Sequence, residues 1–422
     1  MVSDLLPRPP WVFCGRDDLK GCRADAILFA AVMNFWQRIE KPIIGLSPMD
    51  GVTDASFRFI TAKHGCPDVT LTEFVNIETA FFAPDTLVRD LMYSEIERPV
   101  VAQIYGHTPE MFYKVAHIVC ELGFDGVDIN MGCPAKKVAA KGSGAALIRT
   151  PDLARLIIRT VRQAIKDWCN GQTLSDLQIS PDFIDKIRVA NRLRTGMESA
   201  LERHLIPVSV KTRLGYDRVV VDEWIQTLID EAPAVISVHG RTLKQKYNGN
   251  ADWNAIARAV EIAKRSRTLI LGNGDLKDMA DVDRRVRQTQ VDGVLLGRSA
   301  QGNPWIFRAK DQVKEALRPN QVLDIHEAPI SLKDRFKVIL EHASHFERCW
   351  GSQCFVGMRK HLAWYCRSSP RAAELRARMV RLNSVDEVLR CLRDYAASFA
   401  DEREFANAAF YDHESRITTT AF

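Results

Sequence analysis

Short apolar runs rich in β-branched residues alternate with helix-length amphipathic stretches through most of the chain. Eight runs have the continuous apolar character of strands covered on both faces; they span residues 43–51, 69–75, 99–106, 126–133, 207–214, 234–242, 268–275 and 293–300. The segments between them are helical in length and pattern, as at 109–123 and 222–232. This alternation predicts an α/β fold, a (β/α)8 TIM barrel. An open dinucleotide-binding sheet is disfavoured, because no G-x-G-x-x-G follows the first strand.

The pattern changes after about Arg308, where helical segments follow one another without strands. They occupy residues 330–349, 356–367, 371–382 and 384–402. Earlier, residues 169–206 interrupt the alternation with a stretch that predicts one or two additional helices. We therefore divide the chain into an N-terminal extension at 1–40 with a short amphipathic helix at 25–37, a barrel at 41–310, an all-helical domain at 325–402 and a tail at 403–422.

Composition places the chain among ordinary globular proteins, with 46% hydrophobic residues, 26% charged residues and a net charge of +5. The ten cysteines show no C-x-x-C pair, so we expect mostly unpaired thiols in a reducing cytoplasm. The apolar segment at 26–36 is too short to span a bilayer, and we expect no membrane association. No metal-ligand spacing occurs, and we predict no metal site.

Polar side chains gather where the predicted strands end. They are Ser47, Gln103, Asn130, Cys133, Lys211, Arg213, His239, Arg241, Asn273, Asp275 and Arg298. Barrel enzymes build their active sites at this carboxyl-terminal face. A single residue of this kind is usually a strand cap or a solvated charge, but a set repeated from strand to strand predicts a catalytic mouth.

Glycine-rich turns end the last two strands, with the sequences LGNGD (271–275) and LGRSAQGNP (296–304). Glycine lets backbone N–H groups approach a phosphate, and barrel phosphate sites follow these two strands. Arg298 adds a cation at the same place. A phosphate-bearing cofactor held there would extend its ring across the mouth toward Gln103, Lys211 and Cys133.

The stretch from 126 to 147, GVDINMGCPAKKVAAKGSGAAL, places a cysteine at the end of a strand. Three lysines follow Cys133, at 136, 137 and 141. A thiol beside cations and a glycine-rich turn favours a reactive site that faces an anionic partner. A lone cysteine is more often a small buried apolar residue, so the position at a strand end is what supports the functional interpretation.

The helical domain is the most cationic part of the chain. Residues 331–395 contain thirteen Lys and Arg against seven Asp and Glu, a net +6 that exceeds the +5 of the whole chain. Arg359, Lys360 and His361 lie next to Trp364 and Tyr365, which suits a phosphate backbone with stacked bases. The alternative is a helical domain whose cations are merely solvated.

Eight ordered motifs together resemble the tRNA-dihydrouridine synthases. They are LSPMDGVTDASFR (46–58), TEFVN (72–76), QIYG (103–106), DINMGCPAKKV (128–138), VKTRLG (210–215), VHGRT (238–242), GNGD (272–275) and LLGRSAQGNPWIF (295–307). MRKHLAWY (358–365) is similar to the bacterial B-type members. The resemblance implies reduction of uridine to dihydrouridine in tRNA, with FMN as cofactor, NADPH or NADH as reductant and Cys133 as proton donor.

The resemblance also implies roles for individual residues. Pro48, Met49 and Asp50 would line the flavin through their backbone, Gln103 would meet its pyrimidine edge, and Lys211 and His239 would lie near the ring. Asn273, Gly274, Asp275, Gly297 and Arg298 would hold the phosphate. Asn130 would position the target base. From the charge and aromatic pattern of their segments, rather than from the resemblance, we expect Lys141, Arg359, Lys360 and His361 to contact RNA. We expect a monomer with tRNA as its partner and no obligate protein partner.

Two other functions remain open at this stage. A dihydropyrimidine or dihydroorotate dehydrogenase would share the flavin site but would not need the basic helices. An RNA-binding protein with an inactive barrel would not need Cys133. Three features depart from the family pattern: the first forty residues, the long insertion at 169–206, and Asp50, where a small residue is more usual.

Overall fold

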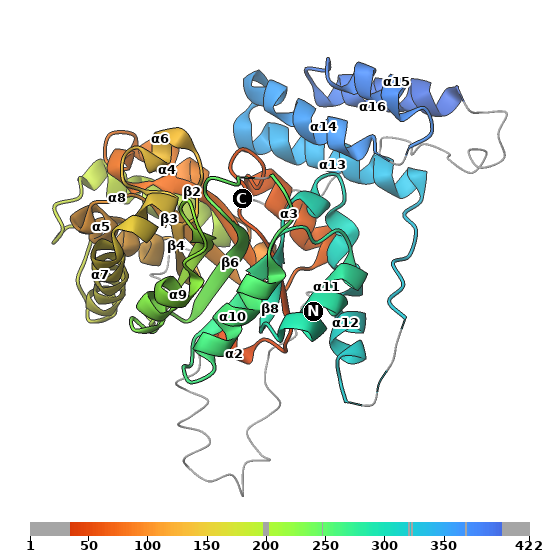
Figure 1. Cartoon of the computed structure of the whole chain (residues 1–422). Coiled ribbons are helices and arrows are strands. Elements are labelled where there is room, and N and C mark those ends of the chain that lie inside the picture. The colour runs from red at the N-terminus through yellow and green to blue at the C-terminus, as the bar shows by residue number, and fades with distance from the viewer. Residues whose placement is uncertain are drawn as a thin grey trace, which may run out of the picture.

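The computed structural model describes residues 34–196, 202–246, 248–319, 321, 324–367 and 369–398. Eight parallel strands close into a barrel in chain order, with β1 paired to both β2 and β8 (Figure 1). The strands are β1 (Ile43–Leu46), β2 (Thr70–Asn76), β3 (Val100–Tyr105), β4 (Gly126–Met131), β5 (Val208–Gly215), β6 (Val235–Thr242), β7 (Leu269–Asn273) and β8 (Gly293–Leu296). The predicted TIM barrel is confirmed, although its first and last strands end earlier than expected.

Helices cover the outside of the barrel. They are α3 (Ala55–Gly65) after β1, α4 (Pro84–Asp90) after β2, α5 (Pro109–Glu121) after β3, α6 (Lys136–Ala139) and α7 (Pro151–Cys169) after β4, α9 (Val221–Ile229) after β5, α10 (Trp253–Ala263) after β6, α11 (Met279–Thr289) after β7 and α12 (Lys310–Ala316) after β8. Asp54, Asp252 and Asp278 start three of them, each accepting a hydrogen bond from the N–H three residues on. None of the described helices is both long and apolar enough to cross a bilayer.

One end of the barrel is closed by α2 (Phe35–Arg38). Its Trp36 is 1% exposed and packs in a cluster with strand residues such as Ile43, Val101 and Leu295. The helix expected at 25–37 lies outside the described residues except for its last four positions. The opposite end, where the strands finish, is therefore the open mouth.

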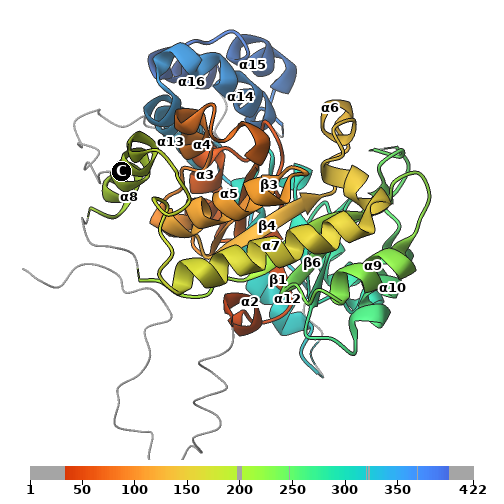
Figure 2. The same ribbon diagram turned by 90° about the vertical axis from the view of Figure 1, so that its left-hand side faces the viewer.

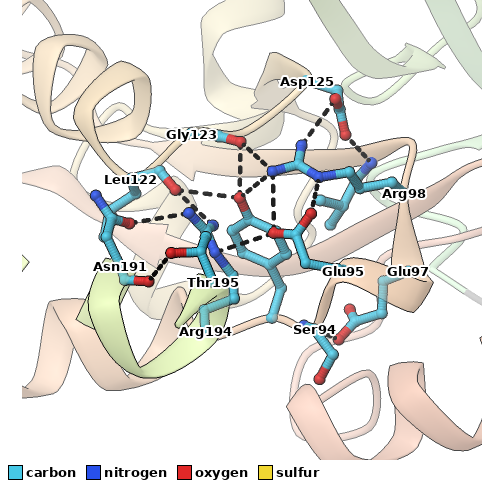
Figure 3. A network of polar contacts seen from close by, with 12 residues as sticks. Ser94, Glu95, Glu97, Arg98, Leu122, Gly123, Asp125, Asn191, Arg194 and Thr195 are labelled. Atoms are coloured by element: carbon cyan, nitrogen blue, oxygen red, sulfur yellow. Dashed lines mark hydrogen bonds and ion pairs between the residues drawn. The ribbon is translucent and has the colours of Figure 1, made fainter. Parts of the chain in front are cut away.

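The interruption at 169–206 contains α8 (Pro181–Thr195), which confirms one additional helix. Its polar face binds the carbonyl end of α5. Asn191 Nδ2 donates to Glu121 O at 2.6 Å. Arg194 Nη1 donates to Leu122 O, also at 2.6 Å (Figure 3). Because these contacts satisfy the last carbonyls of α5, the insertion is built into the side of the barrel.

The C-terminal helices α13 (Leu332–Trp350), α14 (Arg359–Tyr365), α15 (Ala372–Met379) and α16 (Val385–Ala397) confirm the predicted change to an all-helical pattern. They share one apolar cluster that also takes in Ile60 of α3 and Trp305, which follows β8. Figures 1 and 2 both show this group at the end of the barrel where α6 lies, opposite α2. The basic helices thus stand beside the mouth.

Candidate active site

Parallel pairing brings the predicted polar residues together at the mouth. Asn130 on β4 is in register with Lys211 on β5, and Gln103 on β3 is in register with Asp128. His239 on β6 is in register with Arg213 on one side and Asn273 on the other. The residues expected on separate strands therefore form one contiguous surface.

Asn130 fixes the turn that carries Cys133. Its Oδ1 accepts from the N–H of Gly132 at 3.0 Å and from the N–H of Cys133 at 2.8 Å. Its Nδ2 donates to Gln103 Oε1 at 3.0 Å. Since two backbone donors define which side of the amide is oxygen, the second Nδ2 hydrogen of Asn130 remains available to a substrate.

Asp128 completes this network, although the sequence pattern did not single it out as a site residue. The carboxylate is fully buried and accepts from Gln103 Nε2 at 2.7 Å and from Ser209 Oγ at 2.6 Å. Burial raises the pKa of Asp128 to about 6, although these two hydrogen bonds and the charge of Lys211 act to lower it. An aspartate inside the otherwise apolar run GVDIN was the available signal, because a buried carboxylate needs partners.

The Cys133 thiol is buried, with 7% of the residue exposed. Burial is the main cause that raises its pKa above the ordinary cysteine value, and the charge of Asp50 adds to the effect. Gly144 approaches it closely: a Cβ there would lie 3.1 Å from Cys133 Cβ. The thiol therefore keeps its proton at neutral pH.

Lys211 and His239 differ in charge at neutral pH: the lysine is a cation and the histidine ring is neutral. Burial, with Arg213 next, lowers the pKa of Lys211 to about 8, and its Nζ has no hydrogen bond or ion pair to any described residue. Burial and the charges of Arg213 and Lys211 hold the pKa of His239 far below its usual range. The neutral ring accepts from Arg241 Nη1 through Nε2 at 3.4 Å, which leaves its proton on Nδ1.

The expected phosphate loops lie beside each other after β7 and β8. Gly274 has a φ of +129°, and a Cβ there would be 2.8 Å from Ala251 Cβ, so only glycine fits. The Asp275 carboxylate accepts from Arg241 at 2.7 Å, from the N–H of Ala251 at 2.8 Å and from Arg298 at 3.0 Å. Burial opposes ionisation, but these partners together lower its pKa. The two guanidinium groups thus neutralise the acid next to the phosphate loops.

The loop after β1 is compact. Met49 N–H donates to Thr53 Oγ1 and Thr53 N–H donates back to Met49 O, both at 3.0 Å. Pro48 is half-buried and Asp50 is exposed. A Cβ added to Gly297 would lie 3.2 Å from the Met49 sulfur. The loops after β1 and β8 are therefore in contact.

The expected RNA residues do not form one surface. Lys141 is exposed after α6, as are Lys136 and Lys137. Arg359 instead binds the turn between α15 and α16, donating to Leu382 O at 2.9 Å and to Asn383 Oδ1 at 2.6 Å. Lys360 is half-buried near the loop after β1. Partial burial of the Asp50 carboxyl raises its pKa, and the charge of Lys360 opposes this shift.

The expectation that His361 contacts the RNA backbone is wrong. Only 1% of His361 is exposed, and its Nε2 lies 3.3 Å from Asp54 Oδ2. Tyr365 is also buried, with its hydroxyl 3.0 Å from His342 Nδ1. His361 faces the barrel, where it is the hydrogen-bond donor that the buried carboxylate of Asp54 requires.

Comparison with known proteins agrees with this geometry. The family model described as Dihydrouridine synthase (Dus) matches residues 45–171 and 182–401. A probable tRNA-dihydrouridine synthase 2 from Bacillus subtilis (strain 168) is 30% identical over 373 residues, which cover 87% of this chain and 98% of that protein. A probable tRNA-dihydrouridine synthase from Staphylococcus aureus (strain COL) is 29% identical over 377 residues, covering 87% and 98%. The gap between the two matched ranges, residues 172–181, falls within the insertion.

Among solved structures, the crystal structure of DHODH in complex with ferulenol from Eimeria tenella superposes with a TM-score of 0.39 at 14% identity. It covers 66% of this chain and 82% of that chain. The family assignment therefore depends on the family model and the sequence relatives.

Proposed function

We propose, because the chain belongs to the dihydrouridine synthase family, that it reduces uridine to 5,6-dihydrouridine in tRNA. One observation supports the chemistry most directly: a buried thiol that keeps its proton stands at the barrel mouth, on a turn held by Asn130. A positioned acid of this kind is what addition of a proton to a carbon–carbon double bond requires.

FMN is the cofactor we propose, with NADPH or NADH as reductant. When bound, the flavin would supply the hydride. The residues fit such a group: the glycine-rich turns after β7 and β8 offer backbone N–H groups of the kind that bind phosphate, and Arg298 lies beside Asp275 in the same place. The carboxylate of Asp275 is engaged by two arginines, so Asn273, Gly274, Asp275 and Gly297 would contribute backbone N–H groups rather than charge.

The ring would lie across the mouth, where Pro48, Met49 and Asp50 form one wall. Gln103 has one Nε2 hydrogen left after its bond to Asp128, which suits a carbonyl of the pyrimidine edge. Lys211 supplies a half-buried ammonium without a fixed partner among the described residues, where it would stabilise negative charge on the ring. His239, being neutral, offers only its Nδ1–H.

Reduction adds a hydride and a proton across the C5–C6 double bond of uracil, and we assign the proton to Cys133 Sγ. Asn130 would orient the base, since its remaining Nδ2 hydrogen can donate to a uracil carbonyl. A stacked uridine cannot reach the mouth of a barrel, so the nucleotide must be flipped out of its stack. Exposed Lys136, Lys137 and Lys141 are available beside the mouth for the RNA backbone.

The test is to incubate the purified protein with an unmodified tRNA transcript and NADPH, and to measure dihydrouridine by mass spectrometry of the digested nucleosides. We expect a yellow protein with a flavin spectrum and product that depends on RNA. A colourless protein that takes up no FMN would contradict the cofactor assignment. Turnover of free uracil would favour a dehydrogenase instead, and RNA binding without reduction would favour an inactive barrel.

A further inference from the structure

Helix α14 contacts two loops of the mouth at once. At its start, His361 contacts Asp54, which follows the loop after β1. At its end, the Trp364 carbonyl packs onto Gly302 in the loop after β8, where a Cβ would come within 2.4 Å of it. Strands β1 and β8 are paired neighbours. A single helix of the C-terminal part thus spans the loops proposed to hold the two ends of the flavin.

The loop after β1 is tied down at both sides. Asp54 Oδ1 accepts from Phe57 N–H at 2.9 Å and so begins α3, while Thr53 O accepts from buried Arg58 at 2.7 Å. On the other side, Val52 N–H donates to Glu73 Oε1 at 2.9 Å. Glu73 lies at a register shift between Leu71 and Phe74 of β2, where a bulge interrupts the pairing with β3. The conformation of residues 48–53 therefore depends on Asp54 and Glu73.

Both of these carboxyl groups face the C-terminal helices. Asp54 is 6% exposed, and His361 Nε2 is the donor to its second oxygen. His361 in turn packs in an aromatic cluster with Phe57, His342 and Trp364. Burial raises the pKa of Glu73 to about 7, and the charge of Lys360 on α14 opposes the shift. Without α14, the second oxygen of Asp54 would lose its His361 donor, while the first would keep its bond to Phe57 N–H.

We propose that α14 is a structural part of the cofactor site: the His361–Asp54 contact and the packing of Trp364 on Gly302 hold residues 48–53 and 297–302 in the arrangement that binds FMN. His361 is a positioning residue in this scheme, since it touches Asp54 and not the cofactor. The proposal rests on the proposed function for the identity of the ligand. It assigns the C-terminal helices a role in flavin binding that is separate from any contact with RNA.

Two substitutions disrupt this junction in different ways. His361→Phe keeps the aromatic volume but deletes the donor to Asp54, and Gly302→Ala pushes against the Trp364 backbone at the other end of α14. His361→Gln keeps an N–H donor and serves as the conservative variant. Arg390→Ala, at an exposed position of α16 away from the junction, is the control.

The measurements are hydrogen exchange of residues 48–53 in the full chain and the Kd for FMN from flavin fluorescence. If disruption leaves the loop competent in about one molecule in ten, Kd rises about tenfold. Because the open fraction would then rise from a small wild-type value to about nine molecules in ten, we expect exchange in 48–53 to accelerate by at least that factor in His361→Phe and Gly302→Ala. His361→Gln should stay within about twofold of the wild type, and Arg390→Ala should be unchanged.

Unchanged exchange and unchanged FMN affinity in both disrupting variants, each shown to be folded by circular dichroism, would overturn the proposal. Asp54, His342 and His361 also place three ligand-type atoms within 4.8 Å of one another. If the wild-type chain bound one zinc ion and His342→Ala bound none, the junction would be a metal centre. That result would overturn the hydrogen-bonded scheme. A wild-type protein that binds no FMN would instead contradict the proposed function, while loop exchange would still decide whether α14 orders the loop.

Discussion

At the scale of single residues, the mouth is arranged by amide side chains whose orientation is fixed. Asn130 Oδ1 receives two backbone N–H groups, so its Nδ2 must face Gln103; Gln103 Oε1 accepts that hydrogen, so its own Nε2 must face Asp128. If the side-chain amide of Asn130 or Gln103 were rotated by half a turn, its oxygen would face an acceptor and its nitrogen would face a donor. Under the proposed function, the network would present defined donors to the cofactor and the base before either arrives, which would reduce reorganisation during reaction.

Replacement of the proposed acid should separate the two halves of the reaction. Cys133→Ala should retain FMN and NADPH oxidation but lose RNA reduction by about two to four orders of magnitude, because only the second half needs the proton. Stopped-flow absorbance of the flavin with and without tRNA would measure both. An equal loss in NADPH oxidation would give the thiol a structural role instead.

The same assignment fixes the sign of a pH dependence. The active form of Cys133 is protonated and its pKa is raised, so activity is retained through neutral pH and lost as pH rises through that raised value. Single-turnover RNA reduction by pre-reduced enzyme should therefore stay level up to about pH 8.5, the ordinary cysteine pKa.

At the scale of elements, the strands were predictable because every residue of β4, β6 and β8 is buried, which leaves continuous apolar runs. The ends were less so: β1 stops at Leu46, where the chain turns toward Pro48, which has no N–H for a ladder. The orientation of the seven-residue α14 was not predictable, since RKHLAWY carries polar and aromatic residues on each face and the pattern cannot show which face is buried. Asp54 likewise looks like an ordinary helix cap, and only the fold reveals its contact with His361.

The neighbouring loops after β7 and β8 lead to a prediction about FMN affinity. Arg298→Ala should raise the Kd for FMN about tenfold or more, because the variant lacks a charge-assisted contact of roughly 1.5–3 kcal/mol. The effect should exceed the contact itself, since the Asp275 carboxylate would then have one guanidinium fewer beside the phosphate. Adding Asp275→Asn to Arg298→Ala should recover part of the affinity. A double variant that binds FMN no better than Arg298→Ala would show that this acid does not repel the phosphate.

At the scale of the whole molecule, the cations divide into structural and available sets. Arg359 holds the turn that connects α15 to α16, so reversing its charge would disturb these helices and report nothing specific about RNA. The lysines of the α6 segment are different: Lys136, Lys137 and Lys141 are exposed. Figure 2 shows α6 standing above the mouth, across from α14. RNA that enters the mouth from solvent would meet this segment.

Removal of these charges should therefore weaken tRNA binding without disturbing the flavin. Every phosphate that the protein no longer neutralises lowers the magnitude of the log–log salt slope of binding by about one. We expect Lys136→Ala together with Lys141→Ala to lower that slope by about two, while FMN content and NADPH oxidation stay at wild-type levels. Lys166→Ala, exposed near the end of α7 and away from α6, is the matched control and should leave the slope unchanged. Filter binding of one tRNA transcript at several salt concentrations would measure the effect. If the double variant kept the wild-type slope, the RNA would have to follow another path, over Lys360 or the exposed face of α8.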